Sequence, residues 1–360
     1  FLLNKVQQDT AEVKQYKEAM PVEQLTAGIR EHNIKCPKCK GELTDVKQFN
    51  MMVKVDVGIA GKVPCYLRPE TCQTLFTDFL RMTKTMRVKL PQGLAQVGKA
   101  FRNEISPRQT LLRQVEFWQM ESEIFFDPEK INEIENFEKI QDYKISILLA
   151  NKKEKELVKV KDLVTKKIVS GKLIAYYLAR TQQLYEKYGF SVEKMRFREL
   201  DDTERAFYAK EAWDFEVETS LGWMELIANN YRTDYDLKGH AEGSKKDLSY
   251  VYNTGKKVLP HVWEVSMGLD RLCYAILENS FRKEGERTFL SLPFAVVPVH
   301  AGIFPLLANK PELVVKAKEI YDELNGCFEL FFDESGSIGK RYARMDEIGC
   351  PFCLTVDFDS

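Results

Sequence analysis

The feature that most constrains the fold is a pair of strand-like segments, at residues 94–104 and 112–126, that bracket the short loop ISPRQTL. Side chains two residues apart in a strand lie on one face. Arg102 and Glu104 are therefore expected to lie together, and the returning strand is expected to place three further side chains on one face: Arg113, Phe117 and Glu121. The sequence thus predicts an antiparallel pair of strands with a charged face.

That charged face has the groups that a nucleotide requires. An arginine can bind phosphate, Phe117 can stack on a base, and Glu104 can accept a hydrogen bond from an amino group. An exposed sheet stabilised by cross-strand ion pairs would explain the same residues equally well. The strands alone leave both interpretations open.

Three other segments add carboxylates and arginines near the ends of predicted elements. RPET places Glu70 where a turn meets a helix, and GWMELIANNYR places Glu225 on a strand and Arg232 just past its end. HVWEVSMGLDR places Glu264 and Ser266 on one strand face, followed by Arg271 in the first turn of a helix, where the dipole favours phosphate. Histidine is scarce, at 4 residues, and neither a GxxxxGK[ST] nor a GxGxxG phosphate loop is present.

The 360 residues suffice for two or three domains. Residues 1–35 are polar and favour a helix, and residues 36–66 are rich in turn signals and favour a hairpin. The strand signals before residue 128 resume at 196–290, which predicts one domain made of 1–127 and 196–290. Residues 128–195, rich in Lys and Glu, predict a charged helical insertion. From 291 the pattern alternates β-α-β-α-β, beginning with AVVPV at 295–299 as a buried strand, which favours a parallel sheet covered by helices.

Cysteine usage and hydropathy bear on the compartment. The eight cysteines are irregularly spaced, as expected for reduced thiols in a cytoplasmic protein. Cys36 and Cys39 form a CxxC pair that resembles half of a zinc ribbon, with Cys65 and Cys72 as the near candidates for the other ligands, so bound zinc is possible but not predicted. No apolar run reaches about eighteen residues, so no membrane span is expected.

Five motifs, taken in order, resemble one family. RPET, FRNEISPR, YDLKGH, EVSMGLDR and SIGKRYARMDEIG are similar to the glycyl-tRNA synthetases of the archaeal and eukaryotic type, from about residue 36 to 360 except for 128–195. The resemblance implies an α+β class II catalytic domain, an antiparallel sheet flanked by helices, followed by an α/β anticodon-binding domain at 291–360 that is truncated at its C-terminus. It also implies that the dimer-forming motif 1 precedes residue 1, and hence a homodimer.

The resemblance assigns roles to individual residues. Arg102 and Arg271 are implied as catalytic groups that hold the α- and γ-phosphates of ATP, and Glu225 as a ligand of the accompanying Mg²⁺. The implied ATP-binding residues are Arg102, Asn103, Glu104, Leu112, Arg113, Phe117, Glu225, Leu226 and Arg271. The implied glycine-binding residues are Glu70, Glu121, Arg232, Glu264 and Ser266. The chain departs from the family pattern at Val115, Tyr231 and Val265, which puts the fine geometry of the site in question.

The function implied is that of a glycine–tRNA ligase, which converts glycine and ATP into glycyl-adenylate and pyrophosphate and then transfers glycine to the 3′ end of tRNA(Gly). One alternative is a catalytically inactive class II relative that binds nucleic acid as an accessory subunit; it predicts loss of the ATP residues. Another is a class II synthetase for threonine or proline, which RPET and YDLKGH disfavour.

Overall fold

The structure is a computed structural model, and it describes residues 20–59, 61, 63–104, 107 and 111–359. The chain divides into two compact units, residues 1–67 and 68–360. In the first unit, α2 (Val22–Glu31) follows Pro21, and β1 (Lys54–Val57) pairs with β2 (Val63–Tyr66) as an antiparallel hairpin. The expected hairpin at 36–66 is confirmed over these strands. The helix expected over 1–35 is confirmed for α2, while residues 1–19 lie outside the described part.

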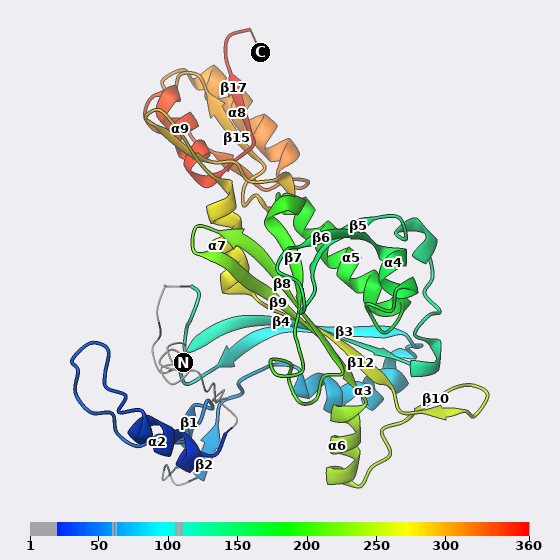
Figure 1. The fold of residues 1–360 in the computed structure, drawn as a ribbon. Helices are drawn as coiled ribbons and strands as arrows, with labels where there is room; N and C mark the ends of the chain where they lie inside the picture. Colours follow the sequence, from blue (N-terminus) through cyan, green and yellow to red (C-terminus); the bar gives the residue numbers. More distant parts are fainter. Residues whose placement is uncertain (1–19, 60, 62, 105–106, 108–110, 360) are drawn as a thin grey trace. The chain divides into compact units, whose positions relative to one another are not determined.

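The second unit is built on one large sheet (Figure 1). Among the described residues eight strands form it, in the spatial order β3-β4-β12-β9-β8-β7-β5-β6. All neighbouring pairs are antiparallel except β5 with β7, so the predicted antiparallel sheet is confirmed in its main part. The strands are β3 (Gln92–Phe101), β4 (Glu116–Phe126), β5 (Lys144–Leu148), β6 (Glu156–Lys159), β7 (Met195–Glu199), β8 (Glu211–Thr219), β9 (Gly222–Thr233) and β12 (His261–Gly268).

The two faces of this sheet differ in character. One face is apolar: Ile124, Trp213 and Trp263 pack in a single core with α4 (Val160–Thr165), α5 (Lys172–Lys187) and α7 (Leu269–Ser280). Part of the other face is also apolar, where Phe125 stacks on Phe79 of α3 (Gln73–Met86) with ring centroids 4.3 Å apart. The rest of that second face is polar and holds the site described below.

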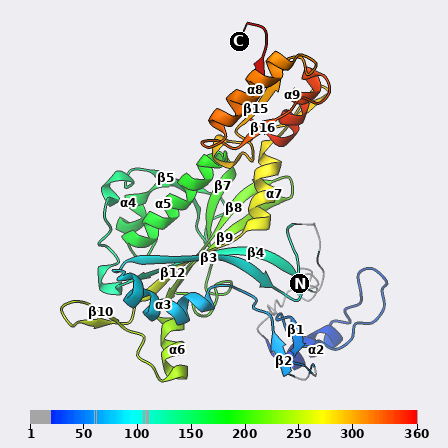
Figure 2. The ribbon, with the colours of Figure 1, turned by 180° about the vertical axis from the view of Figure 1, so that it is seen from behind.

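Figures 1 and 2 show α5 beside the β5–β7 end of the sheet and α3 beside β3 and β12. Helix α6 (Tyr235–Ser244) follows β9 directly and packs against α3. The smaller elements are the hairpins β10 (Tyr250–Val251) with β11 (Lys257–Val258) and β13 (Phe281–Glu284) with β14 (Arg287–Leu290), and the 3-10 turns η2 (Pro128–Lys130), η3 (Phe137–Lys139), η4 (Val192–Lys194) and η5 (Phe294–Val296).

The segment 128–195 differs from the charged helical insertion that the sequence predicts. Helices α4 and α5 are present, but β5 and β6 join the large sheet and extend it beyond β7. The error has a physical cause: β6 is an edge strand, with Val158 buried and Leu157 exposed, and lysines flank it. Lysine-rich edge strands resemble solvated helix faces in sequence, because charge at an edge protects against pairing with other chains.

The C-terminal part is confirmed as an α/β unit with a parallel sheet of order β16-β15-β17. Its strands are β15 (Ala301–Pro305), β16 (Leu330–Phe332) and β17 (Phe352–Val356), and its helices are α8 (Pro311–Leu324) and α9 (Ile338–Ile348). The prediction of a buried strand at 295–299 was wrong: the turn η5 lies there, and the strand begins at Ala301. Across the described chain, every helix is too short or too polar to cross a membrane.

Candidate active site

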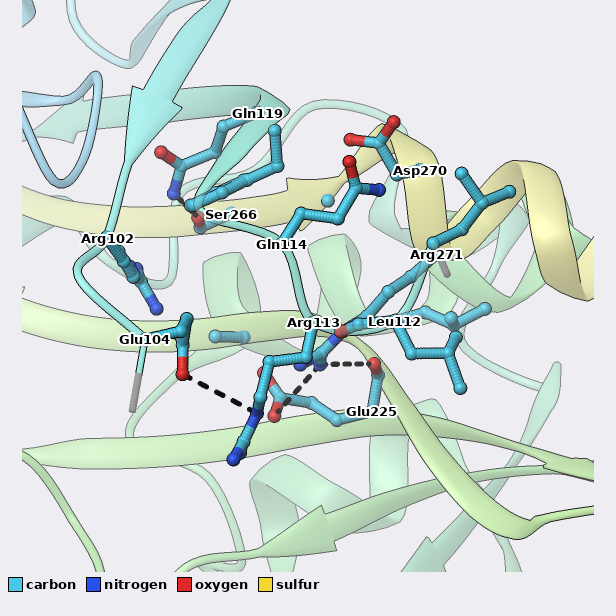
Figure 3. A pocket seen from close by; sticks show the side chains of 15 residues that line it. Arg102, Glu104, Leu112, Arg113, Gln114, Gln119, Glu225, Ser266, Asp270 and Arg271 are labelled. Carbon is cyan, nitrogen blue, oxygen red and sulfur yellow. Dashed lines mark hydrogen bonds and ion pairs between the residues drawn. The ribbon is translucent and has the colours of Figure 1, made fainter. Parts of the chain in front are cut away.

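A cavity opens on the polar face of the large sheet, where β3, β4, β12 and β9 lie side by side (Figure 3). Because these strands come from distant parts of the sequence, the sheet brings together side chains that are up to 169 positions apart, from Arg102 to Arg271. The lining residues are Arg102, Glu104, Leu111, Leu112, Arg113, Gln114, Phe117, Gln119, Glu225, Leu226, Ala228, Ser266, Gly268, Asp270 and Arg271.

Arg102 and Glu104 follow the end of β3 and stand on one side of this cavity (Figure 3). Arg102 donates from Nε to the carbonyl of Pro69 at 3.1 Å, and its guanidinium lies 5.4 Å from the centre of the Phe117 ring. Glu104 is 3.7 Å from Nε of Arg113. The terminal nitrogens of Arg102 are therefore held toward the cavity beside an aromatic face.

Arg271 lies on the other side, in the first turn of α7. Its guanidinium donates to the carbonyls of Leu112 and Glu225, each at 3.1 Å, and lies 3.7 Å from the Glu225 carboxylate. Asp270, which the sequence did not single out, accepts from the backbone N–H of Trp118 at 2.8 Å and so ties α7 to β4. Two arginines thus line one cavity from opposite walls, and arginine is well suited to bind phosphate.

The floor beside the cavity is acidic. Glu121 is 2% exposed and accepts hydrogen bonds from Thr71 Oγ1, from Gln119 Nε2 at 2.8 Å and from Ser266 Oγ at 3.1 Å. Burial raises the pKa of Glu121 above its ordinary value, and the hydrogen bonds from Thr71 and Ser266 oppose the rise. Because Ser266 and Gln119 also line the cavity, Glu121 lies directly behind its surface.

A second buried carboxylate is held by an ion-pair chain. Arg232 donates to one oxygen of Glu264 at 2.8 Å and to both oxygens of Asp236 at 2.7 Å. Asn230 donates to the second oxygen of Glu264 at 2.7 Å. Burial raises the pKa of Glu264 to about 7, against the charge of Arg232. Arg232 is 2% exposed, so its role in this arrangement is to orient Glu264.

The remaining predicted residues lie at the cavity or near the buried carboxylates beside it, with one exception. Glu70 accepts from Gln73 at 2.9 Å and directly precedes Thr71, whose hydroxyl donates to Glu121, so Glu70 lies next to the acidic floor in the chain. Leu112, Arg113 and Leu226 line the cavity. Asn103 is exposed and does not line it. The structure therefore brings the predicted residues together, with Asn103 outside.

Sequence reasoning missed several polar side chains of the floor. Glu123 and Gln119 lie two residues to either side of Glu121, so the same period of two that identified Glu121 could have found them. Asp236 lies four residues after Arg232, in the first turn of α6, whereas Arg232 is near the end of β9. Thr71 directly follows the predicted Glu70. No sequence pattern indicates that these four side chains are all buried.

The three departures from the family pattern do not line the cavity. Tyr231 and Val265 alternate with Arg232 and Glu264, and therefore point to the opposite face, where they pack in or against the main core. Tyr231 also shares a hydrogen bond of 2.7 Å with His261. Val115 is exposed just before β4. The polar arrangement is thus preserved despite these substitutions.

The CxxC pair of the first unit lies in a tight turn, where Lys40 N–H donates to the Cys36 carbonyl at 2.9 Å. Hydrogen bonds from the Cys39 and Lys38 backbone lower the pKa of Cys36, which favours the thiolate. Among the described residues, however, Cys36 and Cys39 belong to no cluster of three or more His, Cys, Asp or Glu ligands.

Comparison with known proteins adds to this geometry. The family model described as "tRNA synthetase class II core domain (G, H, P, S and T)" matches residues 57–280, and "Anticodon binding domain" matches residues 294–360. The glycine–tRNA ligases of Methanocaldococcus jannaschii and Thermococcus gammatolerans are each 35% identical to the chain, over 94% of its length and 74% of theirs. The solved structure of Giardia lamblia prolyl-tRNA synthetase in complex with prolyl-adenylate matches with a TM-score of 0.56 at 17% identity, over 85% of this chain and 53% of that one. The likeness to the prolyl-tRNA synthetase shows a similarity of fold alone.

Proposed function

The chain belongs to the glycine–tRNA ligase family of the class II tRNA synthetases, and from this premise we propose that the cavity on its large sheet is where glycine is activated with ATP. The observation that carries the proposal is that Arg102 and Arg271 face one cavity whose wall, at Ser266 and Gln119, leads directly to buried Glu121. A triphosphate and a small ammonium compound would then be held side by side.

In the ATP zone, Arg102 binds the α-phosphate and Arg271 the γ-phosphate. The adenine stacks on Phe117, with its amino group donating to Glu104, while Arg113 and the apolar Leu112 and Leu226 complete the wall. The half-exposed carboxylate of Glu225 suits Mg²⁺, a hard cation that prefers oxygen ligands. When bound, Mg²⁺ neutralises charge on the phosphates.

In the glycine zone, Glu70, Glu121 and Glu264 attract the ammonium group, Ser266 presents a hydroxyl, and Arg232 fixes Glu264 in place. A floor packed against the glycine α-carbon would leave no space for a larger side chain. An extra methyl group in a packed site costs about 1–3 kcal/mol, which alone gives about 10–200-fold discrimination against alanine. Unpaired charge adds to the rejection of wrong ligands.

The reaction suits these groups. The glycine carboxylate is already ionised when it attacks the α-phosphate, so the first step needs no general base, in agreement with the scarcity of histidine. The arginines position the phosphates and stabilise the charge that develops as pyrophosphate leaves. In the second step the terminal ribose hydroxyl of tRNA(Gly) attacks the adenylate carbonyl, and AMP leaves.

Amino-acid-dependent ATP–pyrophosphate exchange tests the proposal. Glycine should support exchange, whereas alanine, proline and threonine should not. Exchange with proline or threonine in place of glycine would refute the glycine assignment. The absence of exchange with every amino acid would instead favour an inactive accessory subunit, although Arg102, Glu104 and Arg271 all face the cavity.

We also propose a homodimer and a cytoplasmic location. The homodimer rests on the family resemblance, and sedimentation of the full-length protein as a monomer alone would reject it. The location is supported by the cysteines, all of which are free, as reducing conditions favour. Fluorescence microscopy of a tagged chain in its host would test the location directly.

A further inference from the structure

Glu123 is a buried carboxyl group to which the proposed reaction gives no role. It lies on β4 directly opposite Glu264 of β12, on the same face as Glu121. Its exposed fraction is 0%, and among the described residues neither of its oxygens has a hydrogen-bond partner. One carboxyl oxygen each of Glu123 and Glu264 and the Cys72 sulfur all lie within 4.8 Å of one another.

An ionised carboxylate in this position would be unfavourable, because a buried charge needs a partner. The charged groups around the pair are already engaged. Arg232 on β9 is shared between Glu264 and Asp236 of α6. The other groups that act on the pair are acidic or neutral: Glu121 on β4, Glu70 and Cys72 at the start of α3, and Tyr208 in the turn before β8.

We propose that Glu123 is a positioning residue for glycine: it is a protonated carboxylic acid at neutral pH, and it directs its proton toward Glu264, so that Glu264 carries the negative charge that meets the glycine ammonium. The proposal rests on the proposed function. A neutral Glu123 removes the unpaired buried charge and supplies Glu264 with a third donor beside Arg232 and Asn230. Burial and the neighbouring charge of Glu264 raise the pKa of Glu123 well above its ordinary value, in agreement with this protonation state.

The decisive comparison is between two neutral replacements. Glu123→Gln keeps the shape and a donor, whereas Glu123→Leu keeps similar volume without a donor. We expect Glu123→Gln to retain kcat/KM for glycine within about threefold, and Glu123→Leu to raise KM for glycine about tenfold or more with kcat nearly unchanged, since a lost hydrogen bond to a charged group weakens binding by this order. ATP–pyrophosphate exchange measures both.

The pH profile separates this role from a purely structural one. Because Glu123 is already neutral, Glu123→Gln should leave the midpoint of the acid limb of kcat/KM for glycine within about 0.3 pH unit of the wild type. An ionised Glu123 would instead repel Glu264, and its replacement by Gln would then lower the midpoint by about one unit or more. That shift, or a wild-type KM in Glu123→Leu, would overturn the proposal.

Infrared spectroscopy gives a readout that does not need activity. The difference spectrum between the wild type and Glu123→Gln at neutral pH should contain a protonated carboxyl band, because carboxyls that both proteins share, such as Glu264, cancel in it. The matched control is Glu116→Gln, which removes an exposed carboxylate of the same strand, β4, that pairs with Lys99 of β3; its difference spectrum should contain no such band. If the Glu123→Gln difference spectrum contains no such band, Glu123 is not the protonated group and the inference fails, even where Glu123→Leu does not fold. If the wild type shows no glycine-dependent exchange, the proposed function itself fails.

Discussion

Replacing Glu121 by glutamine should weaken glycine binding while leaving stability nearly unchanged. Glu121→Gln removes one negative charge from the floor but keeps the shape that contacts Thr71, Gln119 and Ser266. A hydrogen bond to a charged group contributes about 1.5–3 kcal/mol. Loss of that charge should therefore raise KM for glycine by about 10–150-fold, with KM for ATP near the wild-type value because Arg102 and Arg271 are untouched.

Stability should respond differently, because burial raises the pKa of Glu121. A carboxyl with a raised pKa in the folded state holds its proton more tightly when folded than when unfolded. Its ionisation therefore costs stability as pH rises above the unfolded-state pKa, and the cost is complete above the folded-state pKa. Glutamine removes this cost at neutral pH but mismatches one of the three donors, at about 1 kcal/mol. The two effects oppose each other, so the melting temperature should stay within about 4 °C.

Exchange kinetics and thermal melting, with Glu116→Gln as the matched control on the other face of β4, measure both effects. Glu121→Ala, which leaves three donors without their acceptor, should abolish glycine-dependent exchange. The reasoning is refuted if Glu121→Gln binds glycine like the wild type. It is equally refuted if the variant loses glycine binding only because it has unfolded at the assay temperature.

Three further predictions concern other parts of the site. Arg102→Ala should lower exchange about 100-fold or more with little change in melting temperature, because this partly exposed side chain makes one hydrogen bond to Pro69; a large loss of stability would contradict this. Asp236→Ala should destabilise the protein by about 3–5 kcal/mol, measured by denaturant unfolding, since it leaves Arg232 buried with one partner fewer. Finally, kcat/KM for glycine should fall as pH is lowered through about 7, where Glu264 takes up a proton. Asn230→Ala removes a hydrogen bond to the charged form of Glu264 and should move that midpoint upward. A flat profile between about pH 5.5 and 8.5, which is about 1.5 units to either side of this pKa, would argue against Glu264 as an ammonium ligand.

Strand periodicity predicted much of the site. The period of two correctly placed Phe117 and Glu121 on one face of β4, although that strand begins at Glu116 and not at 112. The expected strand at 94–104 ends at Phe101, so Arg102 and Glu104 line the cavity from the segment that follows β3. The periodicity could not predict how deeply each side chain is buried, because the same alternation describes a solvated strand face and a buried one. Thus Glu104 lies at the cavity wall, whereas Glu123 lies on a strand face with similar chemistry and is completely buried.

Long-range pairing was the other limit. Motif order predicted the large sheet and the C-terminal α/β unit, but β5 and β6 were not foreseen as members of that sheet. Local propensity describes a strand's own residues, whereas membership of a sheet depends on a partner that is distant in sequence: β5 pairs with β7, some fifty residues later. The charged edge strand β6 joins the sheet through β5, so its place in the large sheet also depends on the pairing of β5 with β7.

The difference in burial between the two zones suggests how one site can treat its two substrates differently. Arg271 and Glu225, which we propose to bind ATP, are about one-third to one-half exposed, so they could adjust as phosphates arrive and as pyrophosphate leaves. Arg232 and Glu264, which we propose to lie on the glycine side, are almost fully buried and fixed by one another and by Asp236. Charges in such a medium interact strongly and have little freedom to reorient. A rigid, desolvated floor can therefore reject a ligand only one methyl group larger, while a solvated wall could not. In the proposed site, selectivity for the smallest amino acid would follow from how deeply the carboxylates are buried as much as from their identity.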